Sequence, residues 1–447
     1  MNLESLAEIK GKGEQARLFP VLAESSKEGR TLSILLATMS HVTEFADAIL
    51  RPLGRPVGAR TKVEAFTEVS FEKCSDPNSR PDGILVVKTG KTVWRALIEA
   101  KIGNGKLSKD QVERYLGIAR DVGVEALITI SNDFTSSPGK HPIAVDKRLL
   151  KKTELFHLSW FSFLTAIKLL DSKETVEDSD HRFVLHELER FLLHPSAGLQ
   201  RFTQMSPSWT EILDRIRGGL STPKTSIEVS EVVSSWHSEL NDLCLLLSRE
   251  TGATVGLKLP PKFRNDASVW ESNDCSLVAE KRLLKAALQI PNAATELEIE
   301  ADLSSRTLRI FSRLSAPLDK VRQASRVNWL LKQLEGSEGE AIRIQSHWPG
   351  AAPVIESSLS DARNDPEVHS HPSKTMLPHS FTVAMRMEDG RKFGGRNTFI
   401  AELEALTLEF YGLVLSQLRA WQPPAPQLKR DEVQPQDVSA GADGDVS

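Results

Sequence analysis

The sequence has few cysteines and no long apolar run. Its 447 residues include three cysteines, Cys74, Cys244 and Cys275, and none of them forms a C-x-x-C pair. A disulfide framework and a zinc ribbon are therefore not expected. No apolar stretch approaches the ~20 residues that a membrane-spanning helix needs, and the first residues lack an apolar signal segment. We therefore expect a cytoplasmic protein without a membrane partner.

Several catalytic and nucleotide-binding motifs are also absent. The sequence lacks the G-x-S-x-G motif of serine hydrolases, a G-x-G-x-x-G motif after a strand, and the G-x-x-x-x-G-K-[ST] phosphate loop. These absences give no support to a serine hydrolase, a dinucleotide-binding enzyme or a P-loop ATPase. The formal net charge is -4, so no overall positive field predicts nucleic-acid binding, although a local positive patch is enough for it.

The composition is that of a globular protein with more than one domain. Apolar residues make up 40% and charged residues 26% of a chain long enough for two or three domains. Gly, Ser, Thr and Pro cluster between residues 218 and 225, which predicts a linker between a first domain, 1–220, and a second, 225–421. Residues 422–447 are rich in Pro, Gln and Asp, and we expect a disordered tail there.

The most informative stretch runs from residue 80 to residue 115. Two apolar runs, 84–87 and 93–98, flank a turn that contains Gly90, and this pattern predicts a β-hairpin. Asp82 comes just before the first run, and Glu99 and Lys101 end the second. Side chains alternate along a strand, so Glu99 and Lys101 point to the same side. The hairpin therefore brings two acids and one ammonium group to one end of two neighbouring strands.

These residue types suit phosphodiester chemistry. Two carboxylates can hold a hard divalent cation, which takes oxygen ligands and keeps several waters. Such a cation activates a bound water and stabilises the charge that develops on a phosphodiester. A lysine beside it can orient the water or neutralise the transition state. The simpler alternatives are that Asp82 begins an Asp-Gly turn and that Glu99 and Lys101 form a solvated strand end.

The same residues resemble the motifs of the PD-(D/E)XK nuclease superfamily, which has the restriction-endonuclease-like fold. The matching positions are Pro81, Asp82, Glu99 and Lys101, and the helix residues from Gln111 to Tyr115 resemble the Q-x-x-x-Y signature of its exonuclease branch. The resemblance implies cleavage of nucleic acid, expected to be DNA, with Mg²⁺ or Mn²⁺ as cofactor. It implies that the two acids bind the metal and that the lysine positions the attacking water.

The roles of the two helix residues follow from the same resemblance. Gln111 would support Lys101 or the phosphate, and Tyr115 would pack against the site or touch the substrate. Ser108 and Gln111 also have capping-box spacing, so Gln111 can instead cap its own helix. For a third acid we prefer Glu68, on the strand next to Asp82, over Glu44, which is expected to face away from the core. The alternative for Glu68 is an edge-strand charge that discourages aggregation.

The order of elements around the hairpin predicts an α/β domain. A helix over 31–50, a strand over 63–71, the hairpin, a helix over 108–121 and a strand over 126–130 give the order αβββαβ, which the core of the superfamily also uses. Thr31 is the expected cap of the first helix. Residues 1–29 are expected to form a short helix and a loop. Residues 150–220 are expected to form a helical extension, with one helix over 181–193.

The second domain is predicted to be α+β. Apolar periodicity predicts helices over 229–247, 277–288, 321–334 and 399–421, and strands over 254–259, 298–303, 307–314, 341–347 and 381–387. Residues 349–380 are expected to form a long loop. No motif in this domain assigns a function. The domain could bind a protein partner or form a homo-oligomer, and the sequence does not choose between these alternatives.

Together these residues and the resemblance predict a metal-dependent nuclease that hydrolyses DNA, and the resemblance implies phage defence or DNA repair as its setting. Residues 1–220 also resemble a widespread bacterial group of nuclease-like proteins without assigned biochemistry, through the blocks 16–21 and 191–198. Two alternatives remain. One is a nuclease fold that binds nucleic acid without cutting it, and the other is a protein whose C-terminal half recognises a partner.

Overall fold

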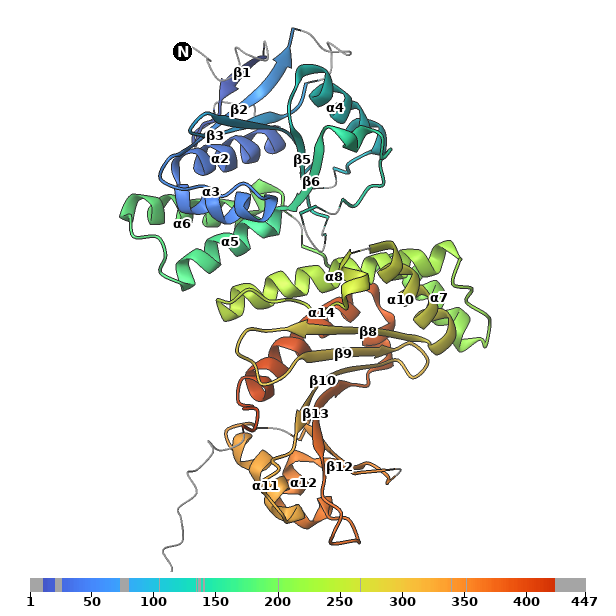
Figure 1. Ribbon diagram of the computed structural model, residues 1–447. Coiled ribbons are helices and arrows are strands. Elements are labelled where there is room, and N and C mark those ends of the chain that lie inside the picture. Colours follow the sequence, from blue (N-terminus) through green and yellow to red (C-terminus); the bar gives the residue numbers. More distant parts are fainter. Residues whose placement is uncertain are drawn as a thin grey trace, which may run out of the picture.

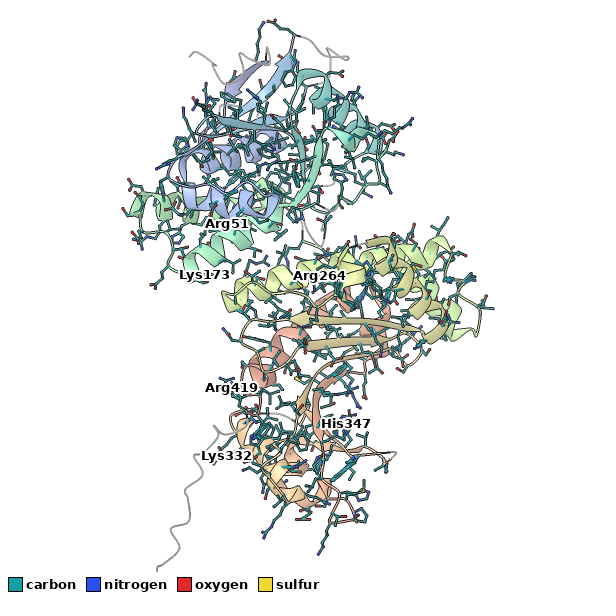
Figure 2. The ribbon with its side chains drawn as sticks, viewed as in Figure 1. Arg51, Lys173, Arg264, Lys332, His347 and Arg419 are labelled. Atoms are coloured by element: carbon teal, nitrogen blue, oxygen red, sulfur yellow. The ribbon has the colours of Figure 1, made fainter. Side chains whose placement is uncertain are left out.

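The computed structural model describes residues 11–20, 26–72, 80–103, 105–133, 135, 138–139, 141–199, 201–265, 267–338, 340–350 and 352–422. These residues form two units, each built on its own sheet, with the long helix α8 (Ile227–Thr251) between the two sheets (Figure 1). We call residues 11–199 the first unit and residues 201–422 the second unit. Arg51 and Lys173 lie on the side of the first unit that faces the second, whereas Lys332 and His347 lie toward the far end of the second unit (Figure 2).

The first unit contains a mixed six-stranded sheet. Its strands follow one another in space as in sequence: β1 (Gly11–Gln15), β2 (Thr61–Phe71), β3 (Gly83–Thr89), β4 (Thr92–Ala100), β5 (Ala126–Ser131) and β6 (Glu154–Ser159). The first four strands pair antiparallel, and β4, β5 and β6 pair parallel. The parallel connection from β4 to β5 runs through helix α4 (Lys109–Val122), whereas the described residues of the connection from β5 to β6 contain only the short turn η2 (Leu149–Lys151).

Helices cover both faces of this sheet. On one face lie α2 (Lys27–His41), α3 (Thr43–Leu50), α5 (Trp160–Ser172) and α6 (Ser179–Leu193), and on the other lies α4 (Lys109–Val122). The middle of β4 is a continuous apolar run because both of its faces are buried. Ile98 packs against the helices of the first face, and Leu97 packs against α4 on the other. Strands buried on both faces lose the polar alternation of a half-exposed strand. Short helical turns η1 (Arg51–Leu53), η2 (Leu149–Lys151) and η3 (Pro195–Ala197) complete this unit.

The first predicted helix is present in a modified form. Its apolar stripe is buried as expected, but the helix starts at Lys27 and is interrupted at Val42, which has extended backbone angles. Thr31 is therefore inside the helix and does not cap it, and its hydroxyl donates to the carbonyl of Ala197 at 3.3 Å. The cap position belongs to Ser26. The expected start was late because Gly29 disfavours a helix interior.

Two other expectations for this unit were wrong. Residues 11–15, expected in a helix or loop, form strand β1, and residues 154–159, expected in a helix, form strand β6. The sequence of β6 is compatible with a helix, but its backbone hydrogen bonds are made by parallel pairing with β5. This pairing partner is not visible from the local sequence. The helix expected over 181–193 is present as α6.

The second unit contains a seven-stranded sheet in which every neighbouring pair is antiparallel. The strands are β7 (Gly256–Leu257), β8 (Leu283–Gln289), β9 (Leu297–Asp302), β10 (Thr307–Ser315), β11 (Arg343–His347), β12 (Ile355–Ser358) and β13 (Ser380–Met387). Their spatial order is β12-β11-β13-β10-β9-β8-β7. The predicted hairpin is confirmed, since β9 and β10 pair through Asp302 and Thr307.

The described helices of this unit are, besides α8, α7 (Ser208–Arg217), α9 (Pro261–Asn265), α10 (Ala267–Lys281), α11 (Gln323–Gln333), α12 (Leu359–Asn364), α13 (Gly390–Gly394) and α14 (Arg396–Phe410), with turns η4 (Pro366–His369) and η5 (Tyr411–Leu415). Residues 283–288, expected to be helical, belong to β8, and the expected loop over 349–380 contains β12 and α12. The tail predicted from residue 422 lies outside the described residues from 423 on. None of the described helices combines the length and apolar character needed to cross a membrane.

Helix α7, expected in the 1–220 domain, packs in the core of the second unit. Trp209 is fully buried there, its ring lies 4.5 Å from that of Phe399, and its indole nitrogen donates to the carbonyl of Phe393 at 3.1 Å. The Gly- and Ser-rich stretch after residue 217 therefore connects two helices of the same core. The chain passes from one unit to the other before Met205, which is also buried in the second core.

This placement of α7 predicts a large effect of truncating Trp209. We expect Trp209→Ala to lower the free energy of unfolding by about 3–5 kcal/mol, the usual cost of removing a buried aromatic ring. Chemical denaturation of the full chain measures this difference. The matched control is Phe183→Ala on α6, whose side chain is 67% exposed, with an expected change within about 0.5 kcal/mol. A Trp209→Ala variant as stable as the control would contradict the packing of α7.

Candidate active site

Asp82, Glu99 and Lys101 converge at one end of β3 and β4. In the antiparallel register Gly83 pairs with Ile98, so Asp82 lies next to Glu99. The carboxylate oxygen Oδ2 of Asp82 accepts a hydrogen bond from the backbone N–H of Ala100 at 2.8 Å, and the Lys101 ammonium donates to Oε1 of Glu99 at 2.6 Å. The three side chains therefore lie on the same side of the sheet, as the hairpin pattern predicts.

A glycine is needed where β3 begins. A Cβ atom on Gly83 would lie 2.9 Å from the backbone oxygen of Phe66 and 3.1 Å from a methyl carbon of Leu36. The distance to the Phe66 backbone is too short for a Cβ atom, and the methyl group of Leu36 would also have to move, so β3 approaches β2 this closely with glycine after Asp82. In the Asp-Gly pair, the glycine therefore allows β3 to begin close to β2, and this places the preceding Asp82 at the site.

Glu99 is almost completely buried, with 1% of its side chain exposed. Burial and the neighbouring carboxylate of Asp82 raise the pKa of Glu99 to about 8, against the opposing effect of Lys101. Burial likewise raises the pKa of Asp82. Two carboxyl groups held together in this way favour sharing a proton or taking up a cation, because either one relieves their mutual repulsion.

Several contacts hold Lys101 in place. Its ammonium also donates to Oε1 of Glu28 at 3.2 Å, and its backbone carbonyl accepts from the indole nitrogen of Trp160 at 2.8 Å. Its backbone N–H donates to Ile130 on β5 at 2.7 Å. Burial acts to lower the pKa of Lys101, but the hydrogen bond and charge of Glu99, with Asp82 and Glu28, outweigh burial and raise it. The Lys101 ammonium is therefore held as a positive charge beside the two carboxylates.

Helix α4 contributes Gln111 and Tyr115. The amide of Gln111 donates to Oε1 of Glu99 at 2.5 Å, whereas the helix is capped by Ser108, whose hydroxyl accepts from the backbone N–H of Gln111 at 3.2 Å. Gln111 therefore contacts the site and leaves the capping to Ser108. Tyr115 is buried under the sheet, and its hydroxyl donates to the carbonyl of Arg80 at 3.2 Å. This hydrogen bond fixes the segment that leads into Asp82.

Glu68 lies next to Asp82 through the backbone, because its N–H donates to the carbonyl of Asp82 at 3.2 Å. Glu68 is exposed, has a positive φ of 53°, and sits where β2 holds one residue more than β1 between two paired positions. Such a bulge shifts the alternation of the strand, so Val69 and Phe71 pack on the same face as Phe66. Among the described residues, the Glu68 side chain has no hydrogen bond or ion pair with Asp82, Glu99 or Lys101.

The third acid near the site is Glu28, which the sequence reasoning missed. It lies in the first turn of α2 and reaches Lys101, although the carboxylate does not join Asp82 and Glu99 in a compact three-acid cluster. The sequence feature that indicates Glu28 is Ser26 at the N-cap position, which places Glu28 in the first turn of the helix, before Gly29. Glu44, the other acid considered from the sequence, pairs instead with His181, with 2.9 Å between the carboxylate oxygen and Nδ1.

A hydroxyl and two imidazoles continue the row of polar groups across the sheet. Thr129 pairs with Glu99 and with His157 in the parallel register. The Thr129 hydroxyl lies 2.8 Å from Nδ1 of His157 and 2.9 Å from Nε2 of His141. Burial lowers the pKa of His141 to about 4 and also lowers that of His157, so both rings are neutral at pH 7.

The arrangement suits a small hard cation. Oε2 of Glu99 is buried and has no hydrogen-bond donor among the described residues. A divalent cation ligated by this oxygen and by Asp82 would satisfy it, and oxygen ligands are what Mg²⁺ and Mn²⁺ prefer. The donor set therefore fits the cofactor that the sequence motifs imply.

Comparisons with known proteins found no matching family model and no match among curated proteins. The interpretation of the site therefore rests on its residues and their geometry.

The raised pKa of Glu99 predicts that stability without metal falls as the pH rises. The folded state keeps the Glu99 proton up to about pH 8, whereas an ordinary glutamate releases it near 4.5, so the folded state binds more protons between these values. Stability should then decrease with pH across this window, with a slope of at most about 1.4 kcal/mol per pH unit for one proton. Thermal melting in EDTA from about pH 5 to about pH 8, a range that lies within this window, measures the slope.

The matched variant for this prediction is Glu99→Gln, which keeps the shape of the side chain and cannot ionise. Its melting temperature should fall less with pH than that of the wild type. Equal pH dependence in the two proteins would show that Glu99 does not carry the shifted proton.

Proposed function

We propose that the chain is a metal-dependent nuclease that hydrolyses phosphodiester bonds of DNA, with Asp82 and Glu99 holding Mg²⁺ or Mn²⁺. The observation that carries the proposal is the convergence of these two carboxylates with the Lys101 ammonium at the ends of two paired strands. The resemblance to the PD-(D/E)XK superfamily supports it through the same residues. The chain order α2, β2, β3, β4, α4, β5 is also the order expected for that superfamily.

The residues of the chain suggest a division of labour. A metal ion bound by the two carboxylates supplies an activated water and offsets charge on the phosphate. Lys101, held by Glu99 and Glu28, places a positive charge beside the same carboxylates and stabilises the negative charge that develops during hydrolysis. Gln111 donates to Oε1 of Glu99 and so orients Oε2 away from its own amide.

Positive side chains that could attract the phosphate backbone lie on the hairpin and near the start of α4. Lys88 lies on β3, six residues or ~20 Å from Asp82 at ~3.3 Å per residue, and Lys91 lies in the turn beyond it. Arg95 is buried. Near the start of α4, Lys106 and Arg114 are exposed. We assign the nonspecific attraction of nucleic acid to this end of α4.

The proposal predicts loss of cleavage when the site is altered. We expect Asp82→Ala and Lys101→Ala each to reduce Mg²⁺- or Mn²⁺-dependent cleavage by at least ~10²-fold, because each removes a charge that acts in the transition state. The assay uses linear, circular and single-stranded DNA, with RNA as a further substrate, and circular dichroism verifies folding. Lys91→Ala, in the distant turn, is the matched control. Undiminished cleavage by both site variants would overturn the proposal.

A second set of variants separates the two candidate third acids. Glu28→Gln removes one of the two negative partners of Lys101, and we expect ~10-fold slower cleavage, in the range seen when a group that orients a metal site is lost. Glu68→Gln should cleave as the wild type does, because the Glu68 side chain is exposed. The reverse order of the two effects would restore Glu68 as the third ligand.

A nuclease fold that binds DNA without cutting it is the alternative outcome of the same assays. In that case the wild type would retard DNA in a gel with a steep salt dependence and would release no metal-dependent products. Asp82→Ala would then leave binding unchanged.

A further inference from the structure

Three acids from two helices meet inside the second unit, far in sequence from the site described above. Glu239 and Asp242 are one helical turn apart on α8, which places them on one face, and Glu404 lies on α14. One carboxylate oxygen from each acid lies within 4.8 Å of the other two. Three carboxylates at this separation repel one another strongly unless something positive lies between or beside them.

The acids are buried, and their oxygens are poorly satisfied. Glu239 and Asp242 are each 0% exposed. Neither oxygen of Glu239 has a hydrogen-bond donor among the described residues, and Oδ1 of Asp242 has none either. A buried carboxylate without any partner is costly, and native structures normally satisfy such groups. The fully buried, unpartnered carboxylate of Glu239 is an observation separate from the clustering itself.

Two arginines accompany the acids but do not balance them. The guanidinium of Arg201 contacts Oε1 of Glu404 at 2.7 Å and Oδ2 of Asp242 at 3.4 Å. The charge of Arg249 also acts on Asp242 and Glu404. When all three acids are ionised, three carboxylates face two guanidinium groups and leave one negative charge uncompensated, and no described hydrogen bond joins either arginine to Glu239. Burial accordingly raises the pKa of Glu239 well above its ordinary value.

We propose that Glu239, Asp242 and Glu404 form a binding site for a hard divalent cation. The free acceptors are the two oxygens of Glu239 and Oδ1 of Asp242, all carboxylate oxygens. Neither cysteine nor histidine belongs to the cluster of described residues, so its chemistry suits Mg²⁺, Mn²⁺ or Ca²⁺ and not the softer metals. The cation supplies the missing positive charge and gives Glu239 the partner that the protein does not provide.

The position of the site indicates what the cation does. The site joins α8 to α14. Two of its acids, Asp242 and Glu404, also bind Arg201, which lies in the segment by which the chain enters the second unit. The backbone N–H of Phe202 also donates to Asp242, and Arg249 lies over the ring of Phe161 on α5, 5.5 Å from its centroid. The cation therefore stabilises the junction between the two units, a structural role independent of the proposed nuclease site.

Counting bound Mn²⁺ in four full-length proteins tests the proposal. Electron paramagnetic resonance of free Mn²⁺ gives the number of ions bound to the wild type, Asp82→Ala, Glu239→Gln and the double variant. We expect Asp82→Ala to keep one bound ion and the double variant to lose it. Glu250→Gln, an exposed acid on the same helix, is the matched control in the Asp82→Ala background and should keep the ion. Saturating Mn²⁺ should also raise the Tm of Asp82→Ala and not that of the double variant.

Equal Mn²⁺ binding by Asp82→Ala and by the double variant overturns the inference. An Asp82→Ala protein that binds no Mn²⁺ also overturns it, because a proton or a water would then occupy the cluster. An ion that depends on Glu239 but not on Asp82 supports this site whether or not the nuclease proposal stands. If Glu239→Gln does not fold, Glu404→Gln, whose side chain is 17% exposed, takes its place with the same expected loss of the ion.

Discussion

The antiparallel register between β3 and β4 is the constraint on which the candidate active site depends. Because Gly83 pairs with Ile98, Asp82 falls beside Glu99; the last residue of β4, Ala100, then supplies an N–H for Asp82, and Lys101, just after the strand, supplies the ammonium. A shift of one residue would move Glu99 and Lys101 to the opposite face of the sheet. The tight glycine contact at the start of β3 and the indole of Trp160 on the Lys101 carbonyl hold this register from either side.

Features set by local sequence could be predicted, and features set by the rest of the fold could not. The hairpin and the helix after it follow from apolar alternation, a glycine turn and a serine cap, and they carried Asp82, Glu99, Lys101 and Gln111 to one place. Glu68 was misplaced because its positive φ inserts an extra residue, which a period-two pattern does not reveal.

Other errors have the same origin in tertiary structure. Glu28 was overlooked because Gly29 disfavours the helix that carries it, and burial of the neighbouring stripe outweighs this local cost. β6 and α7 were misassigned because their partners are distant in the chain: a parallel strand pairing in one case and an aromatic cluster formed with Phe393 and Phe399 in the other. The acid cluster on α8 and α14 was likewise invisible, since Glu404 is more than 160 residues from Asp242.

The double hydrogen bond on Glu99 has a consequence for ion selectivity. Its Oε1 already accepts from both Lys101 and Gln111, so the group can offer an incoming ion one oxygen and not two. Calcium commonly takes acidic side chains in a bidentate manner and gathers six to eight oxygens, whereas the smaller magnesium ion accepts single oxygens in an octahedron completed by water. At the proposed metal site, a carboxylate that offers one oxygen would therefore discriminate by ionic radius and coordination number and would disfavour the larger ion.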